Sequence, residues 1–343
     1  MTFDPNAPAQ PGLLFGVPTD PETALIHVLP VPFDATTSYA AGTARGPESV
    51  LYASAQVDLL DRRFGSPWRA GIHMRRIDPE LSELSSRARA LAEPIIEDGS
   101  PDGHDGALAE IERAGQHVRQ LTHTFARECI ARQRIPAILG GDHSTPLGAI
   151  LACAEAHPGM GVLQLDAHMD LRHAFEGFRY SHASIMHNVL TEAPNIARLT
   201  QVAIRDYCEE ERDVASQHES VVRTFFWDDL SDRLARDGAW HDCCAQIIET
   251  LPRDVYVSVD IDGLDPALCP HTGTPVPGGL SFQQFSMLIE TLARSGRRIV
   301  GFDLVEVAPG PNPDEPEWDA NVGARALYRL CGMAALSRGV RLD

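Results

Sequence analysis

Residues 160–170, MGVLQLDAHMD, decide the expected fold and its chemistry. A short apolar run ends in Asp166, and His168 and Asp170 follow at two-residue steps. Alternate residues of a strand share one face, which would put the side chains of Asp166 and His168 on the same side. Two carboxylates and an imidazole in one small volume need a cation to offset their repulsion. The stretch therefore predicts a metal site at a strand end, although an isolated Asp-x-His is more often an ion pair on a surface loop.

Three further motifs follow short apolar segments: GGDHS at 140–144, SVDIDGLDP at 258–266 and DLVEVAP at 303–309. Each has a simple structural explanation on its own, such as a glycine turn capped by Ser144 or a turn at Asp262 and Gly263. If all of these motifs were only turns, several carboxylates would lie together at one edge of the sheet with no positive charge to balance them. The residues predicted to bind metal are His143, Asp166, His168, Asp170, Asp260 and Asp262.

The size and composition of this ligand set indicate two metal ions. Six ligands, four of them carboxylates, exceed what one small cation needs, and they suit two divalent ions bridged by carboxylates. Oxygen-rich ligation with some imidazole favours manganese over zinc, and nickel can occupy similar ligand sets.

The composition places the chain among globular proteins. It has 343 residues, 43% of them hydrophobic, and its net charge of −19 disfavours nucleic acid and anionic membranes as partners. Seven scattered cysteines without a CxxC pair indicate reduced thiols. Because the sequence has no run of about 18 apolar residues, we expect no membrane span. Because the N-terminus lacks a basic segment followed by an apolar one, we expect no signal peptide. The expected location is the cytoplasm.

The order of apolar and polar segments predicts an α/β fold of three layers, α/β/α, with a mainly parallel sheet. Residues 1–21 are expected to form an irregular arm and 22–343 a single catalytic domain, with an exposed excursion at 78–106. The expected strands are 24–29, 135–139, 160–165, 199–204, 221–226, 255–260 and 298–302. The expected helices are 48–60, 107–132, 184–191, one capped by Ser281 and Gln284 and ending at Gly296, and 319–337. In such sheets ligands bind beyond the carboxyl ends of the strands, where all four motifs fall.

The four motifs, in this order, resemble those of the ureohydrolase family, the arginases and agmatinases, over roughly residues 31–332. This resemblance implies a three-layer α/β fold and a binuclear manganese centre that hydrolyses a guanidinium group to urea and an amine. It also implies that Asp166 and Asp260 bridge the ions, that His143 and Asp170 complete one site, and that His168 and Asp262 complete the other. It further implies a homo-oligomer, a trimer or hexamer.

The resemblance also suggests how the reaction proceeds. A metal-bridging hydroxide would attack the guanidinium carbon. Glu306 would hold the guanidinium by charge-assisted hydrogen bonds, and His182, in RYSHAS, matches the proton-shuttling histidine of the family. Asp170 could also accept a proton from the attacking water. His173 and His187 are nearby competitors that we expect to be ordinary histidines.

The substrate is less well defined, beyond being a small cationic guanidino compound. Arginases carry Ser-Gly-Asn before the shuttle histidine, whereas residues 178–181 here are Phe-Arg-Tyr-Ser, and agmatinase-like members often have His-Gly-Thr where residues 182–184 are His-Ala-Ser. Asp206 and Glu210 resemble part of a pocket-lining loop suited to a cationic tail, and Trp318 could add an apolar wall. Arg172 and Arg179 could instead pair with a guanidino acid, and arginine or free guanidine remain alternatives.

Two other functions compete with this one. A dinuclear phosphoesterase also uses Asp and His ligands, but its usual Asn-His-Asp element and convergent basic residues are not found at these motifs. A noncatalytic binding protein could retain the fold, but we would expect it to have lost part of the ligand set, His182 or Glu306.

Overall fold

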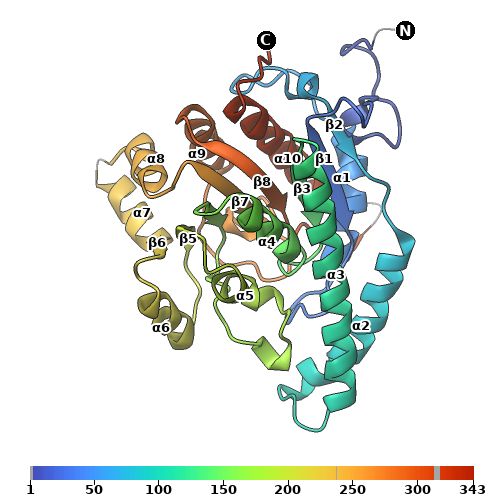
Figure 1. Cartoon of the computed structure of the whole chain (residues 1–343), viewed down its shortest axis with the longest axis vertical. Helices are drawn as coiled ribbons and strands as arrows, with labels where there is room; N and C mark the ends of the chain where they lie inside the picture. Colours follow the sequence, from blue (N-terminus) through green and yellow to red (C-terminus); the bar gives the residue numbers. More distant parts are fainter. Residues whose placement is uncertain (1–2, 237, 313–316) are drawn as a thin grey trace.

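A parallel β-sheet of eight strands forms the centre of the protein (Figure 1). The computed structural model describes residues 3–236, 238–312 and 317–343. The strands lie in the order β2-β1-β3-β8-β7-β4-β5-β6, and every neighbouring pair is parallel. Their bounds are β1 Ile26–Val31, β2 Ile72–Met74, β3 Ile135–Gly140, β4 Gly161–Leu165, β5 Arg198–Ile204, β6 Val222–Phe226, β7 Asp254–Val259 and β8 Arg298–Leu304.

Helices cover both faces of this sheet. On one face α1, α10, α9 and α8 pack in a row, and on the other α2, α3, α4 and α5 do so (Figure 1). The bounds are α1 Gly46–Ser54, α2 Pro79–Asp98, α3 Asp105–Ala131, α4 Leu147–Ala156, α5 Ile185–Glu192, α6 Glu209–Gln217, α7 Trp227–Ala235, α8 Trp240–Glu249, α9 Phe282–Arg294 and α10 Trp318–Ser337. The predicted three-layer α/β fold is confirmed.

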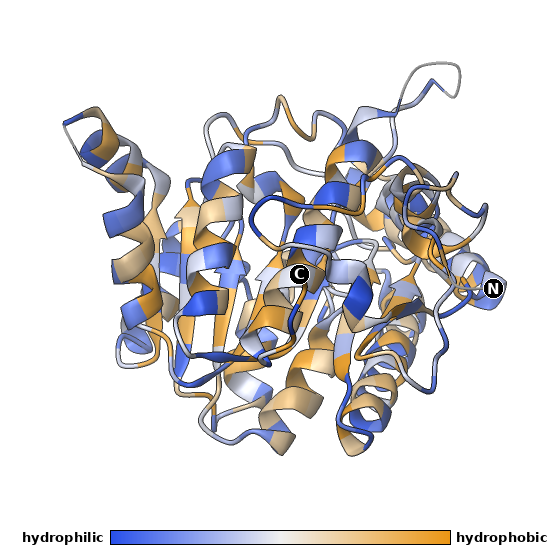
Figure 2. Cartoon of the chain, turned by 90° about the horizontal axis from the view of Figure 1, so that it is seen from above, coloured by the Kyte–Doolittle hydropathy of each residue, from blue (hydrophilic) through white to orange (hydrophobic). Residues whose placement is uncertain are grey.

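The apolar residues form two main cores, one on each side of the sheet. Figure 2 shows apolar residues concentrated on the strands and on the helix surfaces that face them. Central strands such as β3 and β4 are buried along their whole length, as expected for a parallel sheet covered on both faces. Among the described residues, no helix combines the length and the apolar character needed to cross a bilayer.

The prediction of an exposed excursion at 78–106 is wrong for most of that segment. Residues Pro79–Asp98 form α2, whose N-cap Asp78 accepts a hydrogen bond from the backbone N–H of Glu80. Leu81, Ala88 and other residues on one side of α2 are buried against α3. The polar composition reflects the solvent-facing side of an amphipathic helix.

Most other elements agree with the sequence to within a few residues. The Ser281–Gln284 capping box of α9 is present, whereas α1 ends at Ser54, six residues before the expected end. We did not predict the short edge strand β2 or the helices α4, α6, α7 and α8 individually. The backbone of the expected arm is mostly irregular, but Leu14 and Phe15 are buried in the core beside α1; Met1 and Thr2 lie outside the described residues.

The four motifs follow four strands that are adjacent in the sheet, β3, β8, β7 and β4. On β7, Val257 pairs with Leu163 of β4 on one side and with Phe302 of β8 on the other. This register brings the residues after these strands together at the carboxyl edge of the sheet.

Candidate metal centre and substrate cavity

Two groups of possible metal ligands lie at this edge, and Asp166 belongs to both. One consists of His143, Asp166 and Asp170, and the other of Asp166, His168 and Asp262; within each group the possible ligand atoms lie within 4.8 Å of one another. Only His168 is not fully buried. Asp260 is in neither group, but its carboxylate lies 3.4 Å from Nδ1 of His143.

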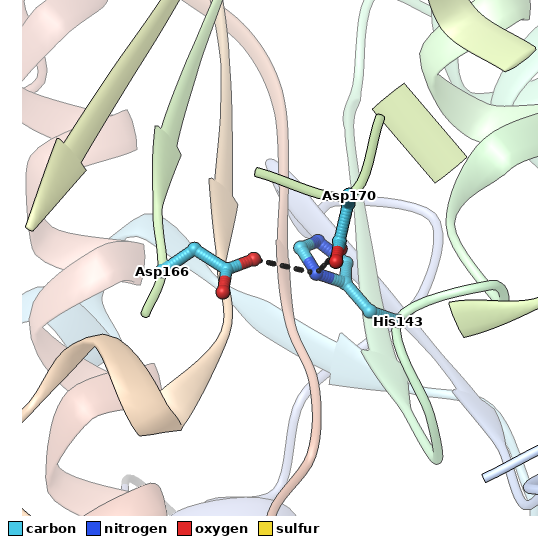
Figure 3. A group of neighbouring side chains, drawn as sticks. All are labelled: His143, Asp166 and Asp170. Atoms are coloured by element: carbon cyan, nitrogen blue, oxygen red, sulfur yellow. Dashed lines mark ion pairs between the residues drawn. The ribbon is translucent and has the colours of Figure 1, made fainter. Parts of the chain in front are cut away.

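His143 is surrounded by carboxylates. Its Nδ1 lies 3.0 Å from Asp166 and 2.9 Å from Asp170, as drawn in Figure 3. This buried nitrogen has no partner with hydrogen-bond geometry. A ring nitrogen that faces several carboxylate oxygens in this way fits a shared cation better than a set of simple hydrogen bonds.

The second group has a similar arrangement. Nδ1 of His168 lies 3.2 Å from Asp262 and 3.5 Å from Asp166. β4 ends at Leu165, so Asp166 and His168 meet in the loop after the strand and not on a strand face. Asp166 and His168 therefore lie close together, as expected, but because of the loop conformation and not because of alternation along a strand.

The electrostatics show that this set of charges lacks a counter-ion in the protein alone. Burial, with Asp166 beside it, raises the pKa of Asp170 to about 7. Burial together with Asp262 and Asp166 raises the pKa of Asp260 well above its usual value. Burial by itself would lower the pKa of His143, but the close carboxylates of Asp166, Asp170 and Asp260 raise it well above normal. Divalent cations would replace these protons, so the donor set fits a metal centre.

Groups behind the ligands fix their orientation. Nε2 of His143 lies 2.9 Å from the hydroxyl of Ser258, which itself donates to Asp303. The hydroxyl therefore accepts the Nε2 proton, which leaves Nδ1 as the ring atom available to a metal. The side-chain amide of Gln164 donates to Asp166 at 2.8 Å. The sequence patterns do not single out these three residues, although all of them lie within the quoted stretches.

Glu306 is buried beside the ligands and has one unsatisfied oxygen. Its Oε1 accepts the backbone N–H of His143 at 2.9 Å, whereas Oε2 has no hydrogen-bond partner among the residues that the structure describes. Burial and the neighbouring Asp260 and Asp142 raise the pKa of Glu306 well above its usual value. The backbone of Glu306 has a positive φ of 61°, and Asp170 has one of 55°. Such conformations are uncommon for residues other than glycine and concentrate at functional sites.

His182 begins a short 3-10 helix, His182–Ser184, and is buried. Burial, with His168 and His143 nearby, lowers its pKa to about 3. Its Nε2 lies 3.5 Å from the hydroxyl of Ser38, and its ring is packed edge-on to Phe175. His182 is therefore neutral in the metal-free protein at ordinary pH.

Four of the six candidate ligands, all except Asp166 and Asp262, line together with His182 a cavity of about 300 Å³ at the carboxyl edge of the sheet. Its lining residues are Ser38, Tyr39, His143, His168, Asp170, Arg172, Phe175, His182, Ala183, Asp206, Tyr207, Glu211, Asp260, Thr274, Pro275, Val276 and Glu306. The buried carboxylates in its lining suit a small cationic substrate.

The residues expected to hold the substrate tail are only partly brought together. Asp206 lines the cavity and is exposed to solvent. Glu210 does not line it, because it lies in the exposed first turn of α6; the neighbouring Glu211 faces inward instead and accepts backbone N–H groups of Leu171 and Cys208. Trp318 also lies outside, where its indole donates to Ala267.

Arg172 and Arg179, which could pair with the carboxylate of a guanidino acid, also differ in their position relative to the cavity. Arg172 lines the cavity, packs over Phe175 and lies 3.6 Å from Glu211. Arg179 is exposed and pairs with Glu112 and Glu192 outside the cavity. His173 and His187 pack against each other and do not line it.

Comparison with known proteins agrees with this geometry. The arginase family model matches residues 24–332. The chain is 32% identical over 330 residues to the N(1)-aminopropylagmatine ureohydrolase of Thermus thermophilus, covering 95% of this chain and 96% of that relative.

Two solved structures share the fold. The proclavaminate amidinohydrolase of Streptomyces clavuligerus has a TM-score of 0.73 at 24% identity, covering 96% of this chain and 99% of the other. The agmatine ureohydrolase of Thermoplasma volcanium has a TM-score of 0.70 at 23% identity, covering 93% and 92%. At such identities these two structures support the fold alone. The family match, together with the identity to the Thermus protein across nearly the whole chain, shows that this chain belongs to the arginase family of metal-dependent ureohydrolases.

Proposed function

We propose that this ureohydrolase cleaves a guanidino compound with a cationic tail, of the agmatine or aminopropylagmatine type, to urea and an amine. The observation that carries the proposal is the pair of ligand groups sharing Asp166 beneath the unsatisfied oxygen of Glu306. The name of the Thermus relative points to the same substrate class.

The ligand groups suggest where the metals bind. His143, Asp166, Asp170 and Asp260 would hold one ion, and His168, Asp166, Asp260 and Asp262 the other. Two divalent ions in such a site lower the pKa of water, which makes hydroxide available near neutral pH. Manganese is the proposed metal because four of the ligands are carboxylates, and nickel is the alternative to be tested.

Glu306 would orient the substrate. Its Oε2 is buried without a donor, and a guanidinium N–H is the donor that matches a carboxylate best. The pairing would hold the substrate carbon over the ligand groups and restore the charge that burial suppresses on Glu306.

His182 would carry the proton. Its ring is neutral in the metal-free protein and lines the cavity, so it can accept a proton released by the attacking water, directly or through Asp170. The ring then gives this proton to the departing amine nitrogen as the carbon–nitrogen bond breaks.

Asp206 would attract the cationic tail at the cavity rim, while Arg172 is the feature that would favour a guanidino acid instead. All seven cysteines are unpaired and lie among the described residues, which supports a reducing compartment such as the cytoplasm. We also infer a homo-oligomer, a trimer or hexamer, which light scattering of the purified protein would test.

The direct test is a urea-release assay with saturating manganese or nickel. The panel comprises agmatine, aminopropylagmatine, arginine, guanidinobutyrate, guanidinopropionate and free guanidine, with Asp166→Asn as the inactive control. We expect the highest kcat/KM for the two polyamine-like compounds. A preference for guanidinobutyrate would shift the substrate class to guanidino acids, and no urea from any compound would contradict the proposal.

A further inference from the structure

Arg205 joins three segments around one half of the candidate metal centre. It follows β5, and its guanidinium donates hydrogen bonds only to main-chain carbonyls, among the contacts that the structure describes. These bonds go to Ala203 (3.1 Å), Asp262 (2.6 Å), Leu264 (3.2 Å), Val276 (3.3 and 2.9 Å) and Pro277 (3.1 Å).

The accepting segments belong to the second ligand group and to the cavity wall. Asp262 is itself a candidate ligand, in the short helix Ile261–Gly263. Val276 lines the cavity together with Thr274, whose hydroxyl lies 3.3 Å from the carboxylate of Asp262. The guanidinium of Arg205 therefore holds both Asp262 and the cavity wall at Val276 in place.

The backbone at Arg205 supports the same ligand group from the other side. The N–H groups of Arg205 and Asp206 both donate to the carbonyl of Ala167, at 2.8 and 3.1 Å. The N–H of Ala167 donates to Asp262 at 3.0 Å, and His168 follows directly in the chain. These hydrogen bonds all fall on the side of His168 and Asp262, and none of them involves His143 or Asp170.

The surroundings leave little room for the guanidinium to move. A methyl group added at Gly279, where φ is +103°, would lie 2.6 Å from the carbonyl oxygen of Leu264 and 2.9 Å from Nη2 of Arg205. Without the guanidinium, several partly buried carbonyls would lose their donor. Lysine keeps the charge but cannot reproduce a planar fork that reaches several carbonyls.

We propose that Arg205 is a positioning residue that sets the second ligand group, His168 with Asp262, and the adjoining wall at Thr274–Val276. This inference rests on the proposed binuclear centre. It predicts that loss of the guanidinium lowers the affinity for one of the two metal ions. The other ion should still bind at the group of His143 and Asp170.

The test compares manganese binding to wild type, Arg205→Lys and Arg205→Gln by calorimetry and by electron paramagnetic resonance. We expect one ion to bind with wild-type affinity and the second about 10- to 100-fold more weakly. The spectrum should change from that of a coupled pair to that of an isolated ion. Arg297→Lys is the matched control, because Arg297 also donates to a carbonyl, that of Leu251, at the opposite edge of the sheet.

Melting curves of the metal-free proteins separate this effect from a general loss of folding. The inference would be overturned if Arg205→Lys and Arg205→Gln bound both ions with wild-type affinity. It would also be overturned if the affinity for both ions fell equally. If the wild type binds two ions but releases no urea, the proposed function fails and the positioning role still stands on the binding data.

Discussion

Nε2 of His143 lies 2.9 Å from the hydroxyl of Ser258, and this contact determines which ring nitrogen is free for a metal. Ser258→Ala removes the acceptor of the Nε2 proton, so both tautomers become accessible. We expect metal affinity to fall about 10- to 100-fold, measured by competition with a chelator. Ser286→Ala, at a buried serine of α9 outside the cavity, should leave affinity unchanged. Equal affinity in the two variants would contradict the role of Ser258.

Replacing Glu306 by Gln should impair catalysis without removing the metals. The variant keeps the shape of the side chain but not its charge, and a charge-assisted hydrogen bond contributes roughly 1.5–3 kcal/mol. We therefore expect kcat/KM to fall by about 10- to 150-fold, with metal content unchanged. Glu176→Gln is the matched control, since Glu176 also has a positive φ, of 55°, but does not line the cavity. A Glu306→Gln enzyme with normal kcat/KM would exclude substrate orientation by this residue.

His182→Ala should slow turnover and leave both ions bound. Proton transfer by a positioned side chain typically contributes 10²- to 10⁴-fold, so kcat should fall within about that range. Added imidazole should restore part of the rate. His187→Ala, at a histidine outside the cavity, should have nearly wild-type kcat. Loss of metal from His182→Ala would show that this histidine supports the ligands and does not shuttle protons.

Metal affinity should rise with pH between about 6 and 8. In the metal-free protein the pKa of Asp170 is raised to about 7 and that of His143 is also raised, so both groups carry protons at the lower pH. Binding requires the deprotonated forms and releases these protons, so lower pH favours the free protein. Calorimetry in buffers of different ionisation enthalpy measures the number released, which should be larger at pH 6 than at pH 8. An affinity that does not change over this range would contradict the linkage.

Asp206→Asn should raise KM for substrates with a cationic tail. The carboxylate lies at the exposed rim, so the loss should be modest, about 3- to 10-fold, in line with the small energy of a solvated ion pair. Glu210→Gln removes an equal charge just outside the cavity and should have little effect. Free guanidine, if it is hydrolysed, should not distinguish these variants, because it has no tail. An equal rise in KM in both variants would indicate only a long-range charge effect.

The sequence predicts that the side chains of the metal-ligand cluster lie close together, because each motif follows a strand of a parallel sheet. The carboxyl ends of β3, β8, β7 and β4 lie on one edge, and because these four strands are neighbours, His143, Asp166, Asp260 and Glu306 meet there. That order, in which these four strands are neighbours, is set by long-range packing and could not be derived from local patterns.

The misassignments have local causes. The amphipathic helix α2 has too few apolar residues to stand out from a polar loop, and α4, LGAILACAEA, is buried on all sides and so lacks a helical periodicity. Glu210 and Glu211 are the same residue type and adjacent in the sequence. Only the start of α6 at Glu209 determines that Glu211 faces inward. The role of Arg205 depends on carbonyls some 60 to 70 residues later in the chain, which no local pattern reveals.

Anomalous diffraction from manganese-soaked crystals tests the central claim most directly. The account predicts two peaks that share Asp166, one beside His143 and Asp170 and the other beside His168 and Asp262. An absence of manganese at these residues under saturating metal would contradict the binuclear centre and the mechanism built on it.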